Sequence, residues 1–327
     1  EADGEKCIIV PLSDGSINAI DNCGTPVWKS DVGGVCGAIS VIDLDGIQAI
    51  LIGDDQGCLT ALGLDGKKLW TADVCDYHRP ETWNTGIGMN NGIAEIRNSS
   101  SVALVVTDKS GAVSAIGSDG GVIWQAHMTS QGHFQGVGRP AVADLDSDGV
   151  DEIVVTGFDG RAHCLSADGS WRWSTEIMPA EGGYHSPLVA DWGDGPRVLM
   201  MGKLDGLVRC LDGFGEEMWQ YQGTGAVGIH MGFAPTVIDN EPHILIAYNK
   251  SGIELITPDG RQVWYREYQR GNQPFGPSVA DIDGDGSPEL LLTRTSNRSL
   301  WILDAEGLVR QEIELDYPAM GVPVISD

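Results

Sequence analysis

The feature that most constrains this chain of 327 residues is a unit that recurs seven times. Each copy holds two apolar runs joined by a turn with Gly, then a turn with Asp or Gly, and a closing Trp. The copies end at Trp28, Trp70, Trp124, Trp173, Trp219, Trp264 and, in the seventh, Val309. Successive ends lie 42 to 54 residues apart. A period in this range, built from short β-runs and turns, predicts a β-propeller.

The repeat also predicts the organisation of each blade. A copy supplies four short strands, and a sheet this small cannot bury both faces alone, so neighbouring sheets must stack. The Trp lies in the outermost strand and is expected to wedge between adjacent blades. We therefore predict an all-β, seven-bladed β-propeller with four antiparallel strands per blade and a single domain over residues 1–327. The expected blades span 319–327 with 1–30, 35–74, 85–127, 136–177, 184–222, 230–268 and 274–315.

The two ends of the chain indicate how the ring closes. The last residues, 321–327, resemble the inner strands that begin near Arg139 and Gly276, and residues 3–10 match the segments that come directly after those strands. The C-terminal strand is therefore expected to join the N-terminal blade. Such closure pairs the sheet edges that an open ring would leave bare.

The repeat resembles that of PQQ-like propellers in its Gly-x-φ-x-Ala-φ run, its Asp-Gly turn and its φ-Trp end, where φ is an apolar residue. That group includes quinoprotein dehydrogenases and BamB-like lipoproteins. The resemblance implies the fold, but not the activity, because propellers host many chemistries. Quinoprotein dehydrogenases carry an adjacent cysteine pair over the quinone, and none of the seven cysteines here adjoins another. PQQ is therefore not expected.

The cysteines divide into two kinds. Cys164 and Cys210 replace the Ala of the repeat and are expected to be buried. Cys7 and Cys23 lie at the ends of antiparallel runs in the first blade, so a disulfide between them is suspected. Such a bond would suit an oxidising compartment.

Charge and hydropathy limit the classes of partner that this chain can have. The chain carries 47 acidic and 20 basic residues, a net charge of −27, which argues against nucleic acid as a partner. No apolar run approaches the ~18 residues of a membrane span. We expect a monomeric extracellular or periplasmic protein, met here as a mature form without its signal peptide.

Two acidic loops carry the strongest motif, D-x-D-x-D-G with a carboxylate at position nine. They resemble the calcium hairpins of FG-GAP and VCBS repeats. Alternate carboxylates converge on one cation, and the Gly permits the sharp turn. We expect two structural Ca²⁺ ions, and the alternative is an acidic turn without metal. The expected ligands are Asp144, Asp146, Asp148 and Glu152 in one loop, and Asp281, Asp283, Asp285 and Glu289 in the other.

A second group of residues is predicted at the opposite face of the propeller, in the loops before the inner strands and between the second and third strands. His133, His185 and His230 precede the inner strands of three consecutive blades, so they are expected to converge at one mouth of the channel. His127, His163 and His243 sit in or beside strands and are expected to be structural. The candidate catalytic residues are His133, Tyr184, His185, His230, Tyr248 and Arg294. The candidate substrate-binding residues are Tyr77, His78, Arg79, Trp83, Arg139, Lys203, Phe233, Asn272 and Gln273.

Three interpretations of this face remain open. The first is a lyase that cleaves an acidic polysaccharide, in fold and residue types similar to the propeller lyases that act on ulvan. Elimination needs a base for the proton α to a uronate carboxylate, and a cation that neutralises that carboxylate. The second is a non-catalytic BamB-like scaffold or a carbohydrate- or protein-binding module. The third is a metal enzyme with the three histidines as ligands. The net charge opposes a polyanionic substrate unless the mouth is locally positive.

Overall fold

The structure is a computed structural model that describes most residues of the chain. The described residues are 8–11, 15–20, 25–34, 36–54, 56–74, 92–97, 100–101, 103–108, 111–128, 139–157, 159–177, 186–201, 206–224, 232–248, 252–268, 277–294 and 298–314. They form strands and turns only. In this part of the chain there is no helix long and apolar enough to cross a membrane.

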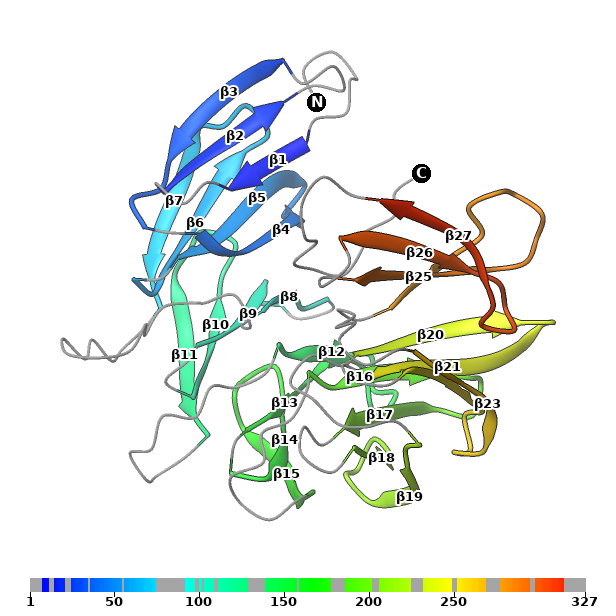
Figure 1. Cartoon of the computed structure of the whole chain (residues 1–327). Helices are drawn as coiled ribbons and strands as arrows, with labels where there is room; N and C mark the ends of the chain where they lie inside the picture. Colours follow the sequence, from blue (N-terminus) through cyan, green and yellow to red (C-terminus); the bar gives the residue numbers. More distant parts are fainter. Residues whose placement is uncertain are drawn as a thin grey trace. The chain divides into compact units, whose positions relative to one another are not determined.

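The chain divides into two compact units, Glu1–Glu181 and Gly182–Asp327. The first unit contains four antiparallel sheets (Figure 1). Their strands are β1 (Ile8–Pro11), β2 (Ser16–Ile20) and β3 (Pro26–Asp31); β4 (Cys36–Leu44), β5 (Ile47–Asp54), β6 (Cys58–Gly63) and β7 (Lys68–Asp73); β8 (Ile93–Glu95), β9 (Leu104–Thr107), β10 (Ala112–Ile116) and β11 (Val122–His127); and β12 (Ala141–Ala143), β13 (Glu152–Thr156), β14 (Arg161–Leu165) and β15 (Trp171–Glu176).

The second unit contains three four-stranded antiparallel sheets. Their strands are β16 (Leu188–Asp191), β17 (Pro196–Met201), β18 (Leu207–Leu211) and β19 (Glu217–Gln222); β20 (Gly232–Ile238), β21 (Glu241–Tyr248), β22 (Gly252–Ile256) and β23 (Gln262–Glu267); and β24 (Ser278–Ala280), β25 (Glu289–Arg294), β26 (Ser299–Leu303) and β27 (Val309–Glu314).

Every sheet is a meander in which each strand pairs with the next along the chain. The innermost strands of successive sheets touch within each unit, since β8 contacts β4 and β12, and β20 contacts β24. Six sheets have the four predicted strands, and the first has three in the described residues. The strand expected to complete it, at 319–327, lies outside the described residues, as does the predicted ring closure.

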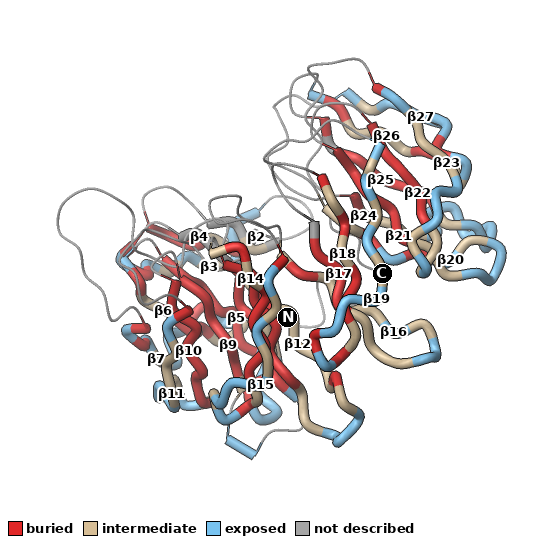
Figure 2. The backbone as a smooth tube through the Cα atoms, turned by 90° about the horizontal axis from the view of Figure 1, so that it is seen from below, coloured by how far each residue is buried: buried red, intermediate tan, exposed pale blue. Residues whose placement is uncertain are grey.

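Burial follows the position of a strand in its sheet. Every residue of β9 and β10 is buried, because both faces of these middle strands are covered by neighbouring sheets. The outer strand β15 alternates between exposed and half-buried residues. Figure 2 shows the middle strands as buried and the outer strands as largely exposed. One core cluster joins Val113 and Ala115 of β10 with Ile153 and Val155 of β13, so the core lies between sheets.

The recurrent Trp is the wedge that the repeat predicted. Trp70 donates from its indole Nε1 to the Ser118 carbonyl of the next sheet at 3.0 Å, and its ring covers Gly120. A Cβ on Gly120 would lie 2.6 Å from the indole, and its φ of +85° also favours Gly. The same packing recurs for Trp28 on Gly66, Trp124 on Gly169, Trp219 on Gly260 and Trp264 on Gly307.

The cysteines that replace the repeat Ala are buried, as predicted. Cys164 and Cys210 are both 0% exposed, like Ala19, Ala61 and Ala115 at the corresponding positions. Their thiols are free. Cys7 and Cys23, the suspected disulfide pair, lie outside the described residues.

Candidate functional site

The first acidic loop, between β12 and β13, folds around the carboxylate of Asp144. This side chain accepts backbone hydrogen bonds from Asp148 at 3.1 Å and from Gly149 at 3.0 Å. Asp148 in turn accepts from the Val150 N–H at 2.8 Å. The tight turn uses positive φ at Ser147 and Gly149. Repeated Asp-to-backbone bonds thus hold the loop in one conformation.

The second loop, between β24 and β25, repeats this pattern position by position. Asp281 accepts from Asp285 at 3.1 Å and from Gly286 at 2.9 Å, and Asp285 accepts from Ser287 at 2.8 Å. The two motifs therefore encode one local structure, in two different units of the chain.

An arginine from the outermost strand reaches each loop. Arg172 pairs with Asp146 and, at 2.7 Å, with Glu152, while Arg310 lies 3.1 Å from Glu289 and 3.7 Å from Asp283. Both arginines occupy the β-bulge of the third and fourth strands, where the register shifts by one residue. The bulge re-aims the side chain toward the loop.

The glutamate at position nine is buried in both loops, 2% exposed in each case. Glu152 Oε2 accepts from the Leu145 N–H at 2.8 Å, and Glu289 Oε2 accepts from the Ile282 N–H at 3.0 Å. Burial raises the pKa of Glu152, and the Leu145 N–H and Arg172 oppose that rise. The position-nine carboxylates therefore have protein donors on both oxygens.

Different carboxylates converge in the two loops. In the first, ligand atoms of Asp144, Asp146 and Glu152 lie within 4.8 Å of one another; in the second, those of Asp281, Asp283 and Asp285 do. The second set is exposed and matches motif positions one, three and five. It suits a hard cation such as Ca²⁺ better than the first set, because Arg172 pairs closely with Asp146 and Glu152 of the first set, whereas Arg310 approaches Asp283 of the second only to 3.7 Å.

Most of the predicted channel-mouth residues fall outside the described residues. This applies to four of the six candidate catalytic residues and to seven of the nine candidate substrate-binding residues. They are His133, Tyr184, His185 and His230, and Tyr77, His78, Arg79, Trp83, Lys203, Asn272 and Gln273.

Tyr248 was expected at an open pocket, but the structure buries it completely. Its phenol donates to Glu254 Oε2 at 2.5 Å, and Glu254 is also 0% exposed. Burial and the neighbouring Glu254 raise the pKa of Tyr248 far above its usual range. The chain buries this polar ring because a carboxylate on the adjacent strand β22 supplies its partner. Tyr248 thus lies in the core between two adjacent sheets.

Arg294 is likewise buried, although it was expected to hold a substrate carboxylate. It is 5% exposed, its guanidinium lies 3.8 Å from the centroid of Trp301, and Nη1 donates to Glu312 at 2.9 Å. Burial lowers its pKa. The physical reason is that the next two strands of its own sheet provide both an aromatic face and a counter-ion.

Of the predicted substrate-binding residues, Arg139 and Phe233 are described. Arg139 is exposed, and the stem of its side chain covers Gly92, where a Cβ would meet the Arg139 Cγ at 2.0 Å. Phe233 is half-buried and packs against the cluster that contains Leu199, Ile246 and Tyr248. Arg139 is therefore presented at a surface, while Phe233 contributes to packing.

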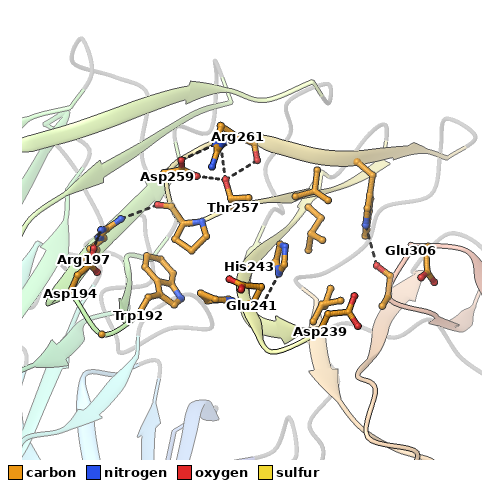
Figure 3. A pocket seen from close by; sticks show the side chains of 18 residues that line it. Trp192, Asp194, Arg197, Asp239, Glu241, His243, Thr257, Asp259, Arg261 and Glu306 are labelled. Atoms are coloured by element: carbon orange, nitrogen blue, oxygen red, sulfur yellow. Dashed lines mark hydrogen bonds and ion pairs between the residues drawn. The ribbon is translucent and has the colours of Figure 1, made fainter.

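A pocket of about 800 Å³ lies in the second unit, among the turns that join first to second and third to fourth strands (Figure 3). Figure 3 shows Trp192, His243 and Glu306 following one another across it. The Nδ1 of His243 donates to the Glu241 carbonyl at 2.9 Å, which leaves Nε2 as the acceptor of the neutral ring.

The charge of this pocket is acidic. Its lining includes two arginines, each paired with an aspartate: Arg197 with Asp194, and Arg261 with Asp259 at 2.8 Å. With Asp239, Glu241 and Glu306, five carboxylates face two guanidinium groups. The pocket therefore suits a neutral or cationic ligand. Sequence reasoning missed this pocket because its charged residues come from four separate turns of the chain. The available signal was that each of these turns carries at least one acidic residue.

Comparison with protein families gives one partial match. The family model of the lambda-carrageenase beta-propeller domain matches residues 103–181, which include the first acidic loop. No curated protein matches the chain.

Solved structures match over nearly the whole length. BamB from Moraxella catarrhalis is 16% identical, with a TM-score of 0.64, over 99% of this chain and 89% of that one. Quinohemoprotein alcohol dehydrogenase from Comamonas testosteroni is 13% identical, with a TM-score of 0.67, over 98% of this chain and 67% of that one. Virginiamycin B lyase from Staphylococcus aureus is 12% identical, with a TM-score of 0.60, over 95% of this chain and 89% of that one. With the seven meander sheets, these likenesses show that the chain is a seven-bladed β-propeller with a BamB-like fold.

Proposed function

We propose that this propeller acts on an anionic glycan. The observation that carries the proposal is the match of residues 103–181 to the lambda-carrageenase propeller domain. By its name, that domain belongs to an enzyme that acts on lambda-carrageenan. The matched stretch spans β9 to β15 and also covers His133, one of the histidines predicted at the channel mouth.

The chemistry assigned to the site changes with the structure. Because Tyr248 and Arg294 are buried in the core, they leave the candidate catalytic set. His133, Tyr184, His185 and His230 remain as candidate acid–base groups, and Arg139 remains as an exposed cation. In a lyase, a histidine or tyrosine removes the proton α to a uronate carboxylate, and the arginine offsets the charge of that carboxylate. In a hydrolase, the same acid–base groups protonate the leaving oxygen and activate water.

We also propose that Ca²⁺ binds the acidic loops. Asp281, Asp283 and Asp285 would hold one ion, and Asp144 and Asp146 a second, weaker one, because Arg172 already pairs with Asp146. The bound ion would neutralise clustered carboxylates and hold each turn on its sheet. An extracellular or periplasmic location belongs to this proposal, because calcium modules outside cells bind at the millimolar Ca²⁺ found there.

A non-catalytic role is the second candidate, and the likeness to BamB over 99% of the chain favours it. In that case the propeller would bind a protein or glycan with its loops and catalyse no reaction.

The acidic pocket around His243 is not the expected binding site of a polyanion, because its five carboxylates outnumber its two arginines.

A polysaccharide panel separates these possibilities. The protein with Ca²⁺ is incubated with carrageenans and with uronate-containing glycans, and new reducing ends and unsaturated uronates are measured. Reducing ends with unsaturated uronates indicate a lyase, and reducing ends alone indicate a hydrolase. Retention in affinity electrophoresis without cleavage indicates a binding module. If no anionic glycan is cleaved or retained, while a neutral glycan or none is, the proposal fails. Arg139→Ala should weaken the response, and Arg261→Ala, in the acidic pocket, is its matched control.

A further inference from the structure

A serine, a histidine and an aspartate are linked by hydrogen bonds in the fourth sheet. His163 of β14 lies opposite Ser174 of β15 in the strand register. The His163 Nδ1 is 3.1 Å from the Ser174 Oγ, and its Nε2 is 2.9 Å from an Asp159 carboxylate oxygen. Asp159 lies in the turn before β14, where its other oxygen accepts the Arg161 N–H at 3.1 Å.

An arginine completes the cluster. The Nε of Arg161 donates to the Ser174 Oγ at 2.7 Å, and its Nη2 donates to the Ser174 carbonyl at 2.6 Å. The guanidinium therefore lies beside the oxygen that would become negative if Ser174 lost its proton. A cation in this position stabilises an alkoxide.

The partners assign the hydrogens of the neutral imidazole. An ionised Asp159 only accepts, so the proton lies on Nε2, and Nδ1 carries the lone pair. Arg161 only donates, so the Ser174 hydroxyl accepts from Arg161 and directs its own hydrogen to Nδ1. Nucleophile, base and orienting carboxylate are thus in the order that activated serines require.

His163, Ser174 and Trp171 differ in how far they are exposed to solvent. His163 is 4% exposed and lies edge-on to Trp171, with 5.3 Å between ring centroids, whereas Ser174 is exposed. Trp171 is itself 50% exposed. The base is therefore shielded from water, the serine residue lies at the surface, and an apolar ring beside the imidazole offers a surface to a small acyl group.

The corresponding positions in other sheets show what is particular to this one. The third residue of the third strand meets a strand-four partner in every blade, for example Thr60 with Thr71 at 3.1 Å and Ser114 with Gln125 at 2.9 Å. These pairs join two polar side chains without a base. Among the seven described pairs, His163–Ser174 alone combines an imidazole with a hydroxyl.

We propose that Ser174 is a nucleophile that cleaves small acyl esters, with His163 as its base and Asp159 as a positioning residue. Ser174 Oγ bonds to the ester carbonyl carbon while its proton passes to His163 Nδ1. The bond from that carbon to the alcohol oxygen then breaks, and His163 returns the proton to the departing alcohol. Water, deprotonated by the same nitrogen, next adds to the acyl-serine, which releases the carboxylic acid and restores Ser174. This activity is independent of the proposed glycan site.

The test uses the full chain and p-nitrophenyl acetate. We expect release of p-nitrophenolate and, when the reaction is quenched early, one acetyl group on the peptide that contains Ser174. Ser174→Ala should abolish both signals, and His163→Gln should slow acylation at least about 100-fold. When the rate is expressed per active site, counted from the early acetylation burst, Asp159→Asn should lower kcat with little change in KM, which loss of structure alone would not do. Thr71→Ala removes the matched hydroxyl of β7 and should leave the rate unchanged.

Peptide mapping of the unaltered protein keeps the test independent of how well the variants fold. Acetyl groups on lysines but not on the Ser174 peptide would overturn the proposal. A hydrolysis rate that is equal in the unaltered protein and in a folded Ser174→Ala variant would overturn it as well.

Discussion

Replacing Tyr248 with Phe tests directly whether the phenol of this residue is buried against Glu254. The substitution removes one hydroxyl and keeps the ring, so the packing against Leu199 and Ile246 persists. It deletes the 2.5 Å bond to Glu254 Oε2, which then keeps, among the described residues, the Thr224 N–H at 3.2 Å. A buried hydrogen bond to a charged group contributes about 1.5–3 kcal/mol. We therefore expect the free energy of unfolding to fall by about 2 kcal/mol.

The matched control is Tyr221→Phe, because Tyr221 donates to the other oxygen of the same carboxylate at 2.6 Å. That oxygen keeps two donors after the change, from the Thr224 hydroxyl at 2.7 Å and from Gln262. The acceptor stays satisfied, and the loss should be nearer the ~1 kcal/mol of an ordinary hydrogen bond. The two variants thus remove one tyrosine hydroxyl each, from the two different oxygens of the Glu254 carboxylate.

Urea unfolding followed by tryptophan fluorescence measures the loss in free energy of unfolding for each variant. The comparison holds provided that the slope of this free energy against urea concentration is the same in all variants. If Tyr248→Phe is as stable as the unaltered protein, or loses less than Tyr221→Phe, the phenol is not held by Glu254. The assignment of Tyr248 to the interior would then be wrong, and its original place in the candidate catalytic set would return.

Three further predictions concern the loops, the wedges and pH. Chelation of Ca²⁺ should lower the melting temperature. In a calorimetric titration with Ca²⁺, Asp283→Ala should remove the tighter of the two binding events. Arg172→Ala should raise the Ca²⁺ affinity of the loop that contains Asp144 and Asp146. Gly120→Ala should lower the free energy of unfolding by about 1–3 kcal/mol more than Gly46→Ala, since both have positive φ but only Gly120 lies under an indole; equal losses would disprove the wedge. Burial, followed by the bond to Glu254, raises the pKa of Tyr221 to about 12, whereas an unfolded tyrosine ionises near pH 10. Stability should therefore fall as pH rises from about 10 to about 12, and less so in Tyr221→Phe.

The repeat and the acidic motifs were predictable because each is written in adjacent residues. The Trp–Gly wedge needs one residue at a constant place in every copy, so Trp70 and Gly120 are visible as members of a series. The loop at Asp281 is likewise contained in one short run. Their hydrogen bonds connect residues two to five positions apart, which a sequence pattern records directly.

The burial of Tyr248 and Arg294 could not be predicted in this way. Both stand at the end of a strand next to a loop, where polar residues are usually exposed. The groups that bury them lie on other strands: Glu254 for Tyr248, and Trp301 with Glu312 for Arg294. The signal that was available is the unusual residue inside an apolar run, such as Glu254 in Gly-Ile-Glu-Leu-Ile. A charge there requires partners nearby.

That unusual residue occupies the same place in every blade, the third position of the third strand. The positions around it are constant, since a small or apolar residue comes after it and the wedge Trp stands across from that neighbour. In the seventh blade the strand register places Gln311 there, and the predicted equivalent, Val309, is wrong by two residues. Packing between blades therefore leaves this one side chain free to vary. Its polar atoms are satisfied by a strand-four partner in some blades, as for Thr60, and by a neighbouring sheet in others, as for Glu254. Among the described residues, Asn18 Oδ1, Arg209 Nε and Trp301 Nε1 have no hydrogen-bond partner. The seven residues are Asn18, Thr60, Ser114, His163, Arg209, Glu254 and Trp301. A hydroxyl pair, a buried carboxylate with five donors and an imidazole between serine and aspartate are three solutions to one geometric requirement. The repeat thus maintains the fold at its Trp and Gly positions, and it can differ in chemistry from blade to blade at this one.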